Sequence, residues 1–180
     1  MVTTSIATPT LQLGTSGTAV QNMQELLLKQ VGVGGLSADG IFGPITDLAV
    51  RVFQRRSFLD DDGIVGPQTW NLLMMPDGVS HLPTLRRGTQ GALVERLQQA
   101  LTLGPATGPL NEVQQIIGTR GFYFGRIDGD FGPMTEQAIR DFQQNPPFNN
   151  PSITPVDGIV GPKTWDGLKS LVTRVSHIFL

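Results

Sequence analysis

Apolar residues recur at helical spacing in three short segments of the first part of the chain. Positions three and four residues apart share one face of a helix, so each segment predicts a helix with one buried side. The first stripe consists of Val20, Met23, Leu26, Leu27 and Val31. The second segment begins at Pro44 and is expected to place Leu48, Ala49, Val52 and Phe53 against a core. The third is a short helix from Pro67 to about Leu73, with Trp70 facing inward.

A tight turn followed by a proline precedes the second of these helices. It reads Asp39-Gly40-Ile41-Phe42-Gly43-Pro44-Ile45-Thr46. Asp bonds to nearby backbone groups, Gly accepts a positive φ, and Pro is favoured at the first helical position. The first helix instead has Ser16 or Thr18 as the expected capping residue. Gly-Pro turns and caps of this kind predict irregular connections between short helices.

Three motifs of the first part return later in the same order. The turn at Asp39 is repeated at Asp128, 89 residues on, in Asp128-Gly129-Asp130-Phe131-Gly132-Pro133-Met134-Thr135. Asp62-Gly63-Ile64-Val65-Gly66-Pro67-Gln68-Thr69-Trp70 returns 95 residues later, from Asp157 to Trp165. The segment Gly14 to Val20 returns 74 residues later, from Gly88 to Val94. A solenoid would need at least three short repeats of fixed period, so this pattern predicts two domains in tandem.

The increasing offsets locate the added residues of the second copy. We expect a first domain at 11–75, a linker at 76–84 and a second domain at 85–172. An insertion at about 104–118 carries Val113, Ile116 and Ile117 at helical spacing and predicts one extra helix. The aromatic run Phe122-Tyr123-Phe124 is expected to cover the second bundle. The predicted fold class is all-α: two small three-helix bundles, the second with an inserted helix.

Composition narrows the classes of partner. The chain has 180 residues, 39% hydrophobic and 16% charged, with a net charge of −2 and no cysteine. That charge gives no electrostatic reason to expect a nucleic acid or an anionic membrane as partner. No run of 18 apolar residues is present, so no membrane insertion is predicted. Residues 1–10 hold neither a basic cluster nor an apolar run, so no signal peptide is visible and the export route stays open.

No group of residues has the spacing of a catalytic or metal site. Each Asp of the repeated turns precedes a Gly and is expected to cap a turn. Asp60-Asp61-Asp62 are consecutive, whereas a helical calcium loop needs alternating acidic positions and a distal Glu. His81 and His177 have no partner at zinc-ligand spacing. We therefore predict no enzyme activity, no metal and no cofactor.

The three ordered motifs, occurring twice, resemble the peptidoglycan-binding domain-like family. The resemblance covers about four-fifths of the chain, from Gly14 to Leu73 and from Gly88 to Leu168. It implies a small orthogonal three-helix bundle that targets cell walls, as found beside amidases, lytic enzymes and peptidases and in phage endolysins. The second copy departs from the pattern through its insertion and its long loop at 145–155, which would lie beside its ligand groove.

The expected ligand site is the exposed side of the first turn and the ends of the second helix. Peptidoglycan offers acetyl groups, amides and carboxylates, for which amide, hydroxyl, Arg and apolar groups are suitable partners. The candidate ligand-binding residues are Ile41, Phe42, Thr46, Gln54, Arg126, Phe131, Thr135 and Gln143. The alternative interpretation is that the Phe and Gln residues close the bundle.

We expect non-catalytic peptidoglycan binding in the cell envelope or outside the cell. The alternative is a structural or adaptor component of a phage-like or envelope-associated assembly, with other assembly proteins as partners.

Overall fold

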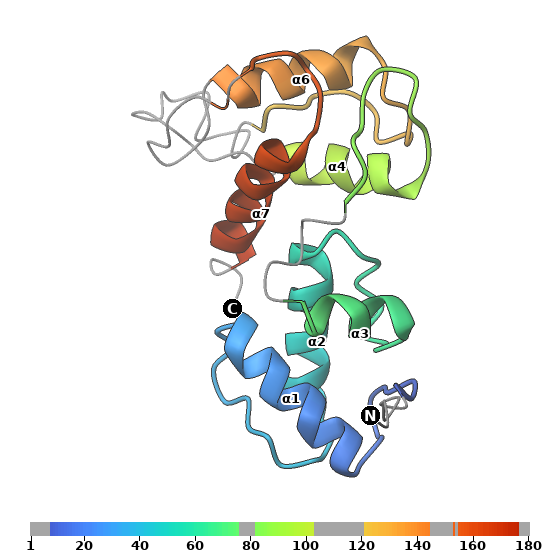
Figure 1. Cartoon of the computed structure of the whole chain (residues 1–180), viewed down its shortest axis with the longest axis vertical. Coiled ribbons are helices and arrows are strands. Elements are labelled where there is room, and N and C mark those ends of the chain that lie inside the picture. The colour runs from blue at the N-terminus through green and yellow to red at the C-terminus, as the bar shows by residue number, and fades with distance from the viewer. Residues whose placement is uncertain (1–7, 76–81, 103–120, 145–152, 154, 177–180) are drawn as a thin grey trace, which may run out of the picture. The chain divides into compact units, whose positions relative to one another are not determined.

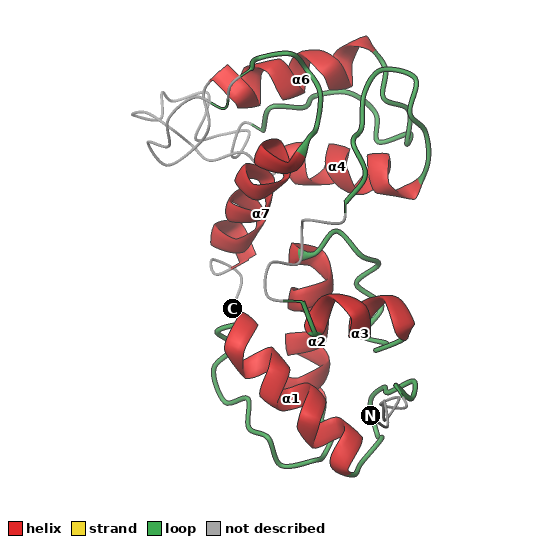
Figure 2. Cartoon of the chain, in the orientation of Figure 1, coloured by secondary structure: helices red, strands yellow, loops and turns green. Residues whose placement is uncertain are grey.

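A computed structural model of the chain describes residues 8–75, 82–102, 121–144, 153 and 155–176 (Figure 1). The described residues form helices joined by irregular loops, with isolated β-bridges and no strand (Figure 2). The chain divides into two compact units, residues 1–78 and 79–180. The first unit holds α1 (Thr18–Gln30), α2 (Pro44–Arg56) and α3 (Pro67–Leu73). The second holds α4 (Ala92–Thr102), α6 (Pro133–Gln144) and α7 (Pro162–Ser176).

The all-α fold class is therefore confirmed for the described part of the chain. The division between the units falls inside the predicted linker at 76–84. The expected inserted helix at about 104–118 lies outside the described residues. The exact domain bounds stay predictions.

The core of the first unit is built from the predicted helix stripes, with one correction. Val20, Met23 and Leu27 of α1 and Phe53 of α2 are all at most 3% exposed, as expected. Leu48 was expected in this core but is 41% exposed. A helix turns about 100° per residue, which places Leu48 some 140° from Phe53. The buried face of α2 is instead completed by polar residues, which apolar periodicity alone does not reveal.

The prediction of a Ser16 or Thr18 cap for α1 was wrong. The N-cap is Gly17, and no side chain caps the helix. Gly17 has φ 123° and donates its N–H to the carbonyl of Gly40 at 2.8 Å. Ser16 lies in an antiparallel bridge with Ile41. Backbone pairing with the following turn thus takes the place of a side-chain cap.

The contacts of the second unit repeat those of the first. The bridges Leu11↔Val65 and Ser16↔Ile41 have counterparts in Leu85↔Val160 and Gln90↔Asp130. The Trp70 indole N–H donates to the carbonyl of Pro9 at 2.8 Å, and that of Trp165 donates to the carbonyl of Pro83 at 3.0 Å. The structural repeat therefore begins at Pro9 and Pro83, five residues before the first motif that the sequence suggested.

The aromatic run ahead of α6 covers the second unit only in part. The ring of Phe122 meets that of Phe142 edge-on, with centroids 5.3 Å apart. Tyr123 is 5% exposed and donates its hydroxyl to the carbonyl of Arg126 at 2.7 Å. Phe124, in contrast, is 71% exposed.

Candidate functional site

Four buried glutamines hold the four Asp-Gly turns, two in each unit. They are Gln24, Gln54, Gln98 and Gln143, each at most 1% exposed. In the first turn, the Gln24 side-chain amide donates to the Asp39 carboxylate at 2.9 Å and to the Ile41 carbonyl at 3.0 Å. It also donates to the Thr46 hydroxyl at 3.0 Å, and its oxygen accepts the Gly40 N–H at 2.8 Å. One side chain thus fixes a turn and the start of the next helix.

The other three turns have the same set of contacts. Gln54 bonds to Asp62, the Ile64 carbonyl, Thr69 and the Gly63 N–H. Gln143 bonds to Asp157, the Ile159 carbonyl, Thr164 and the Gly158 N–H. Gln98 bonds to Asp128, the Asp130 carbonyl, Thr135 and the Gly129 N–H, and additionally to the Tyr123 hydroxyl. The four turn glycines have φ between 70° and 76°, a backbone conformation that residues other than Gly rarely adopt.

Two of the four turn carboxylates, Asp39 and Asp128, are stabilised in their charged form. The backbone N–H of Ile41, followed by the amide of Gln24, lowers the pKa of Asp39 below its ordinary value of 3.8. The amide of Gln98, followed by the backbone N–H of Asp130, lowers the pKa of Asp128 in the same way. A general acid needs a raised pKa. These Asp residues therefore have the properties of turn-forming groups.

Six of the eight sequence-predicted ligand residues are buried. Phe42, Thr46, Gln54, Phe131, Thr135 and Gln143 are all at most 4% exposed. Their side chains fill the core or take part in the glutamine contacts described above. Ile41 is 60% exposed and Arg126 is also exposed. A ligand contact at any of these residues stays a prediction, and only the last two present side chains to solvent.

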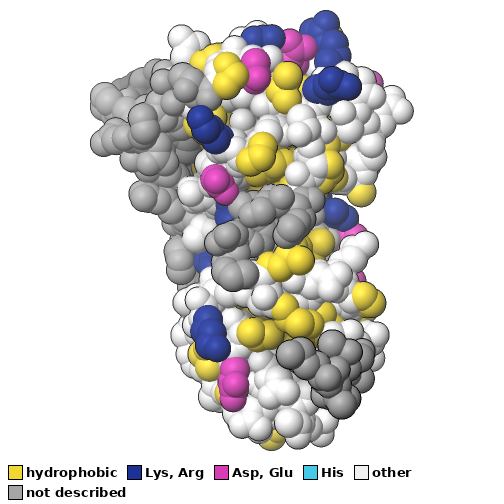
Figure 3. Space-filling model, viewed as in Figure 1, with side chains coloured by type: hydrophobic (Ala, Val, Ile, Leu, Met, Phe, Trp, Pro, Cys, Tyr) yellow, Lys and Arg dark blue, Asp and Glu magenta, His cyan; other side chains and the backbone are white. Residues whose placement is uncertain are grey.

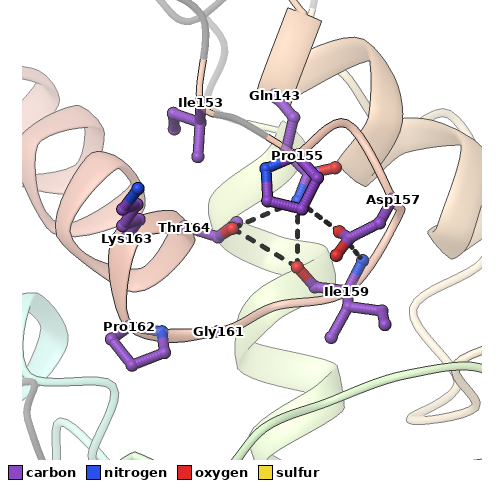
Figure 4. A pocket seen from close by; sticks show the side chains of 9 residues that line it. All are labelled: Gln143, Ile153, Pro155, Asp157, Ile159, Gly161, Pro162, Lys163 and Thr164. Atoms are coloured by element: carbon purple, nitrogen blue, oxygen red, sulfur yellow. Dashed lines mark hydrogen bonds between the residues drawn. The ribbon is translucent and has the colours of Figure 1, made fainter.

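The second Asp-Gly turn of the second unit borders an open hollow of about 350 Å³ (Figure 4). Its walls come from the end of α6, the turn and the first residues of α7. The lining residues are Gln143, Ile153, Pro155, Asp157, Ile159, Gly161, Pro162, Lys163 and Thr164. Figure 4 shows Asp157 and Lys163 on either side of Pro155, with the glutamine contacts behind the proline ring. We call this hollow 2.

The first unit has a smaller hollow at the equivalent place, of about 170 Å³. It is lined by Gln54, Leu59, Asp60, Asp62, Ile64, Gly66, Pro67, Gln68 and Thr69. Seven of these residues occupy the same motif positions as residues lining hollow 2. We call it hollow 1. Sequence reasoning placed the site at the first turn and at the ends of the second helix of each copy, and interpreted the second turn as mainly structural. Of the candidate ligand residues, only Gln54 and Gln143 line the hollows.

An arginine braces the second turn of each unit. Arg51 pairs with Asp47 at 2.8 Å and donates to the Asp61 carbonyl at 2.7 Å. Arg140 pairs with Glu136 at 2.9 Å and donates to the Val156 carbonyl at 3.1 Å. Both connect helix two of their unit to the segment that forms the hollow's rim. In each unit, an arginine therefore holds the second helix and the segment beside the hollow together.

Charged side chains of both signs are interspersed on the face shown in Figure 3. Within the described ranges, no three His, Cys, Asp or Glu side chains lie close enough together to hold a metal ion. Over the same ranges, every helix is too short or too polar to cross a membrane.

Fold and sites together define a class of protein: a tandem pair of small helical modules, each with a shallow hollow beside a glutamine-held turn. The family described as putative peptidoglycan binding domain matches residues 16–73 and 107–168, more than half of the chain. The chain belongs to this family. The second match begins at residue 107, whereas the contacts of Gln98 make α4 the structural counterpart of α1.

The relatives of this chain include an amidase and a carboxypeptidase. A probable N-acetylmuramoyl-L-alanine amidase of Bacillus licheniformis is 28% identical over 90% of this chain and 45% of its own length. The zinc D-Ala-D-Ala carboxypeptidase of Streptomyces albus G is 46% identical over 34% of this chain and 25% of its own. The SleB N-terminal domain is a solved structure with 33% identity and a TM-score of 0.36, covering 38% of this chain and 93% of that one. The chain spans less than half the length of either enzyme.

Proposed function

We propose that this protein binds bacterial peptidoglycan without cleaving it, through two tandem modules, in the cell envelope or outside the cell. The observation that carries the proposal is the repeated hollow. Both units of this chain match a peptidoglycan-binding family, and both have an open, partly apolar hollow at the same motif positions. Two weak sites on one chain gain avidity on a polymeric wall, of order 10²–10⁴ if both engage.

The chemistry of the hollows supports binding rather than catalysis. Each combines Ile and Pro side chains with a Gln amide, a Thr hydroxyl and a few charges at the rim, a composition typical of small-ligand sites. The Gln and Thr groups are already bonded within the protein, so they shape the walls of the hollows. The matched family regions are binding domains, and the named relatives extend well beyond the part aligned with this chain.

One observation favours the alternative, a structural or adaptor part of an envelope or phage-like assembly. Around the first turn of unit one, Leu13, Ile41, Ile45 and Leu48 are each at least 41% exposed. The equivalent positions in unit two are Arg87, Asp130, Met134 and Gln137. Exposed apolar residues that the second copy mostly lacks are suited to a protein contact. This surface differs from the hollows, so the two functions can be tested separately.

Co-sedimentation with purified, insoluble sacculi tests the proposal. The intact chain is expected to bind saturably, and prolonged incubation, with or without divalent metal, is expected to release no soluble wall fragments. A variant with Ile64→Asp and Ile159→Asp removes an apolar wall from both hollows and adds a charge. A loss of about 1 kcal/mol of binding free energy per hollow should weaken each site roughly fivefold.

The matched control is Leu28→Asp, which adds a charge at a residue that is 46% exposed on α1 and lines neither hollow. The control should bind like the parent chain. If the parent fails to sediment with any wall type but associates with itself or with envelope proteins, the assembly function replaces the binding function. Equal binding by the double variant and the control would move the site away from the hollows.

A further inference from the structure

The two hollows share a frame but carry different charges. The residue after the motif proline is Gln68 in hollow 1 and Lys163 in hollow 2. Hollow 1 is lined by two carboxylates, Asp60 and Asp62, and no Lys or Arg is among its described lining residues. Hollow 2 is lined by one carboxylate, Asp157, and by Lys163. The described lining of hollow 1 is therefore net negative, whereas that of hollow 2 carries one charge of each sign.

Resting on the proposed function, we infer that hollow 2 takes the free carboxylate end of a short aliphatic peptide, and that Lys163 determines this specificity. Hollow 1 does not accept that group. The two modules would then bind different parts of the same wall, with hollow 2 selecting stem-peptide ends that remain uncrosslinked.

The positions of the charged groups support a carboxylate in hollow 2. One oxygen of Asp157 accepts the Gln143 amide at 3.1 Å and the Ile159 N–H at 2.9 Å, so this carboxylate is held at its turn. Lys163 is exposed at the start of α7 and comes from the opposite wall (Figure 4). The ammonium group is therefore available to a ligand anion, and the positive end of α7 adds to its field.

The apolar lining indicates the rest of the ligand. Ile153, Pro155, Ile159 and Pro162 offer aliphatic surface suited to methyl and other short alkyl groups. Neither hollow has an aromatic ring among the described residues that line it. The flat face of a sugar ring packs well on an aromatic face, and no such platform is offered here. A peptide with small side chains fits this surface better than a glycan.

The described lining of hollow 1 carries only negative charge. A ligand carboxylate entering it would approach Asp60 and Asp62, and Gln68 supplies no compensating positive charge. A ligand carboxylate inside the hollow would be repelled by these two negative charges. The smaller volume, about 170 Å³ against about 350 Å³, also limits the ligand to a smaller group.

The test uses the full chain and two probes that differ only in charge, N-acetyl-D-alanine and its primary amide. Backbone N–H signals are followed by ¹⁵N–¹H NMR during titration at low salt. The acid is expected to shift the signals of Gly161, Lys163 and Thr164 and to bind two- to fivefold more tightly than the amide, the range for an exposed ion pair. Salt at 0.5 M should reduce the preference through screening.

Reciprocal variants make the assignment specific. Lys163→Gln should abolish the preference for the acid in hollow 2, whereas Gln68→Lys should create one at Gly66 and Thr69 in hollow 1. Lys29→Gln, which removes an exposed charge from α1, is the matched control and should change neither. Equal shifts from both probes in the parent chain, or an unchanged preference in Lys163→Gln, would overturn the inference.

Sacculus binding separates this inference from the function on which it rests. If the chain sediments with sacculi but does not distinguish acid from amide, the inference is wrong and the proposed function stands. If the acid binds hollow 2 as described but sacculi are not bound, the proposed function is wrong and hollow 2 serves a soluble peptide. Failure of both would overturn the inference and the proposed function and would favour a protein contact at the exposed apolar surface around Ile41.

Discussion

Replacing Gln24 by Met should unfold the first unit selectively. Gln24 is fully buried, and Met is an unbranched side chain of similar length that lacks both polar atoms. Three acceptors, on Asp39, Ile41 and Thr46, share the two amide hydrogens, and the amide oxygen accepts one further N–H, from Gly40. The variant therefore loses the equivalent of three hydrogen bonds in one step.

The expected cost is about 2–4 kcal/mol. A neutral hydrogen bond contributes roughly 1 kcal/mol net, and leaving the partners unpaired adds to that when they are buried. The Gly40 N–H and the Thr46 hydroxyl belong to buried residues, whereas the Asp39 carboxylate can regain water. For a unit of fewer than 100 residues, each kcal/mol lowers the melting temperature by about 4–8 °C. A decrease of roughly 8–32 °C in the melting temperature follows.

The assay exploits one tryptophan per unit. The indole N–H groups of Trp70 and Trp165 give one NMR signal each, and both donate to a proline carbonyl when folded. Heating Gln24→Met should remove the Trp70 signal early and leave that of Trp165 near its parental transition. The control is Gln21→Met, the same substitution at an exposed position of α1. If both variants melt within a few degrees of each other, the glutamine contacts do not stabilise the turn.

Two further predictions concern the core and acid stability. Trp70→Ala truncates a side chain that is 4% exposed and should cost about 3–5 kcal/mol, so the backbone N–H signals of the first unit should be lost on heating well before those of the second unit. If the first unit melts as in the parent chain, Trp70 is not part of its core. The pKa values of Asp39, Asp128 and Glu136 are lowered in the folded state, from ordinary values of 3.8 for Asp and 4.5 for Glu. These carboxylates therefore stabilise the fold at pH values above their ordinary pKa. This contribution is lost as the pH falls through their folded-state pKa values. The free energy of unfolding should therefore be flat above about pH 6 and fall below about pH 4.5, and Asp39→Asn should flatten the acid limb of the first unit; an unchanged limb would assign the acid sensitivity to other groups.

Local sequence patterns predicted most of the fold. Apolar stripes and Gly-Pro turns located all six described helices, and the repeated motifs revealed two related units. Leu48 was misplaced because a buried face that includes Thr46 and Gln54 does not look apolar in the sequence. Gly17 was missed as a cap because its partner, Gly40, lies across a loop. Both errors arose from tertiary contacts between segments that no local pattern connects.

The candidate site was harder to predict than the fold. Amide, hydroxyl and aromatic groups at the first turn looked suited to a ligand, but the structure buries six of the eight residues chosen. A buried Gln and an exposed Gln are the same letter, and only the contacts distinguish them. One feature was visible in the sequence: Gln68 and Lys163 differ at matched positions of otherwise near-identical motifs.

The glutamine-held turn also separates the residues that maintain the fold from those that can vary. Within each turn, the Asp, the Gly, the Pro and the Thr have fixed structural tasks. The residue after the Gly takes part only through its backbone, so its side chain and that of the residue after the Pro are not required by these contacts. The residues after the Pro, which face outward, are Ile45, Gln68, Met134 and Lys163. Because the frame tolerates an alkyl, an amide, a thioether and an ammonium group at one position, new binding preferences can arise there by single substitutions that leave the unfolding equilibrium nearly unchanged. Duplication of such a module therefore supplies a second surface that can diverge while the fold beneath it is kept.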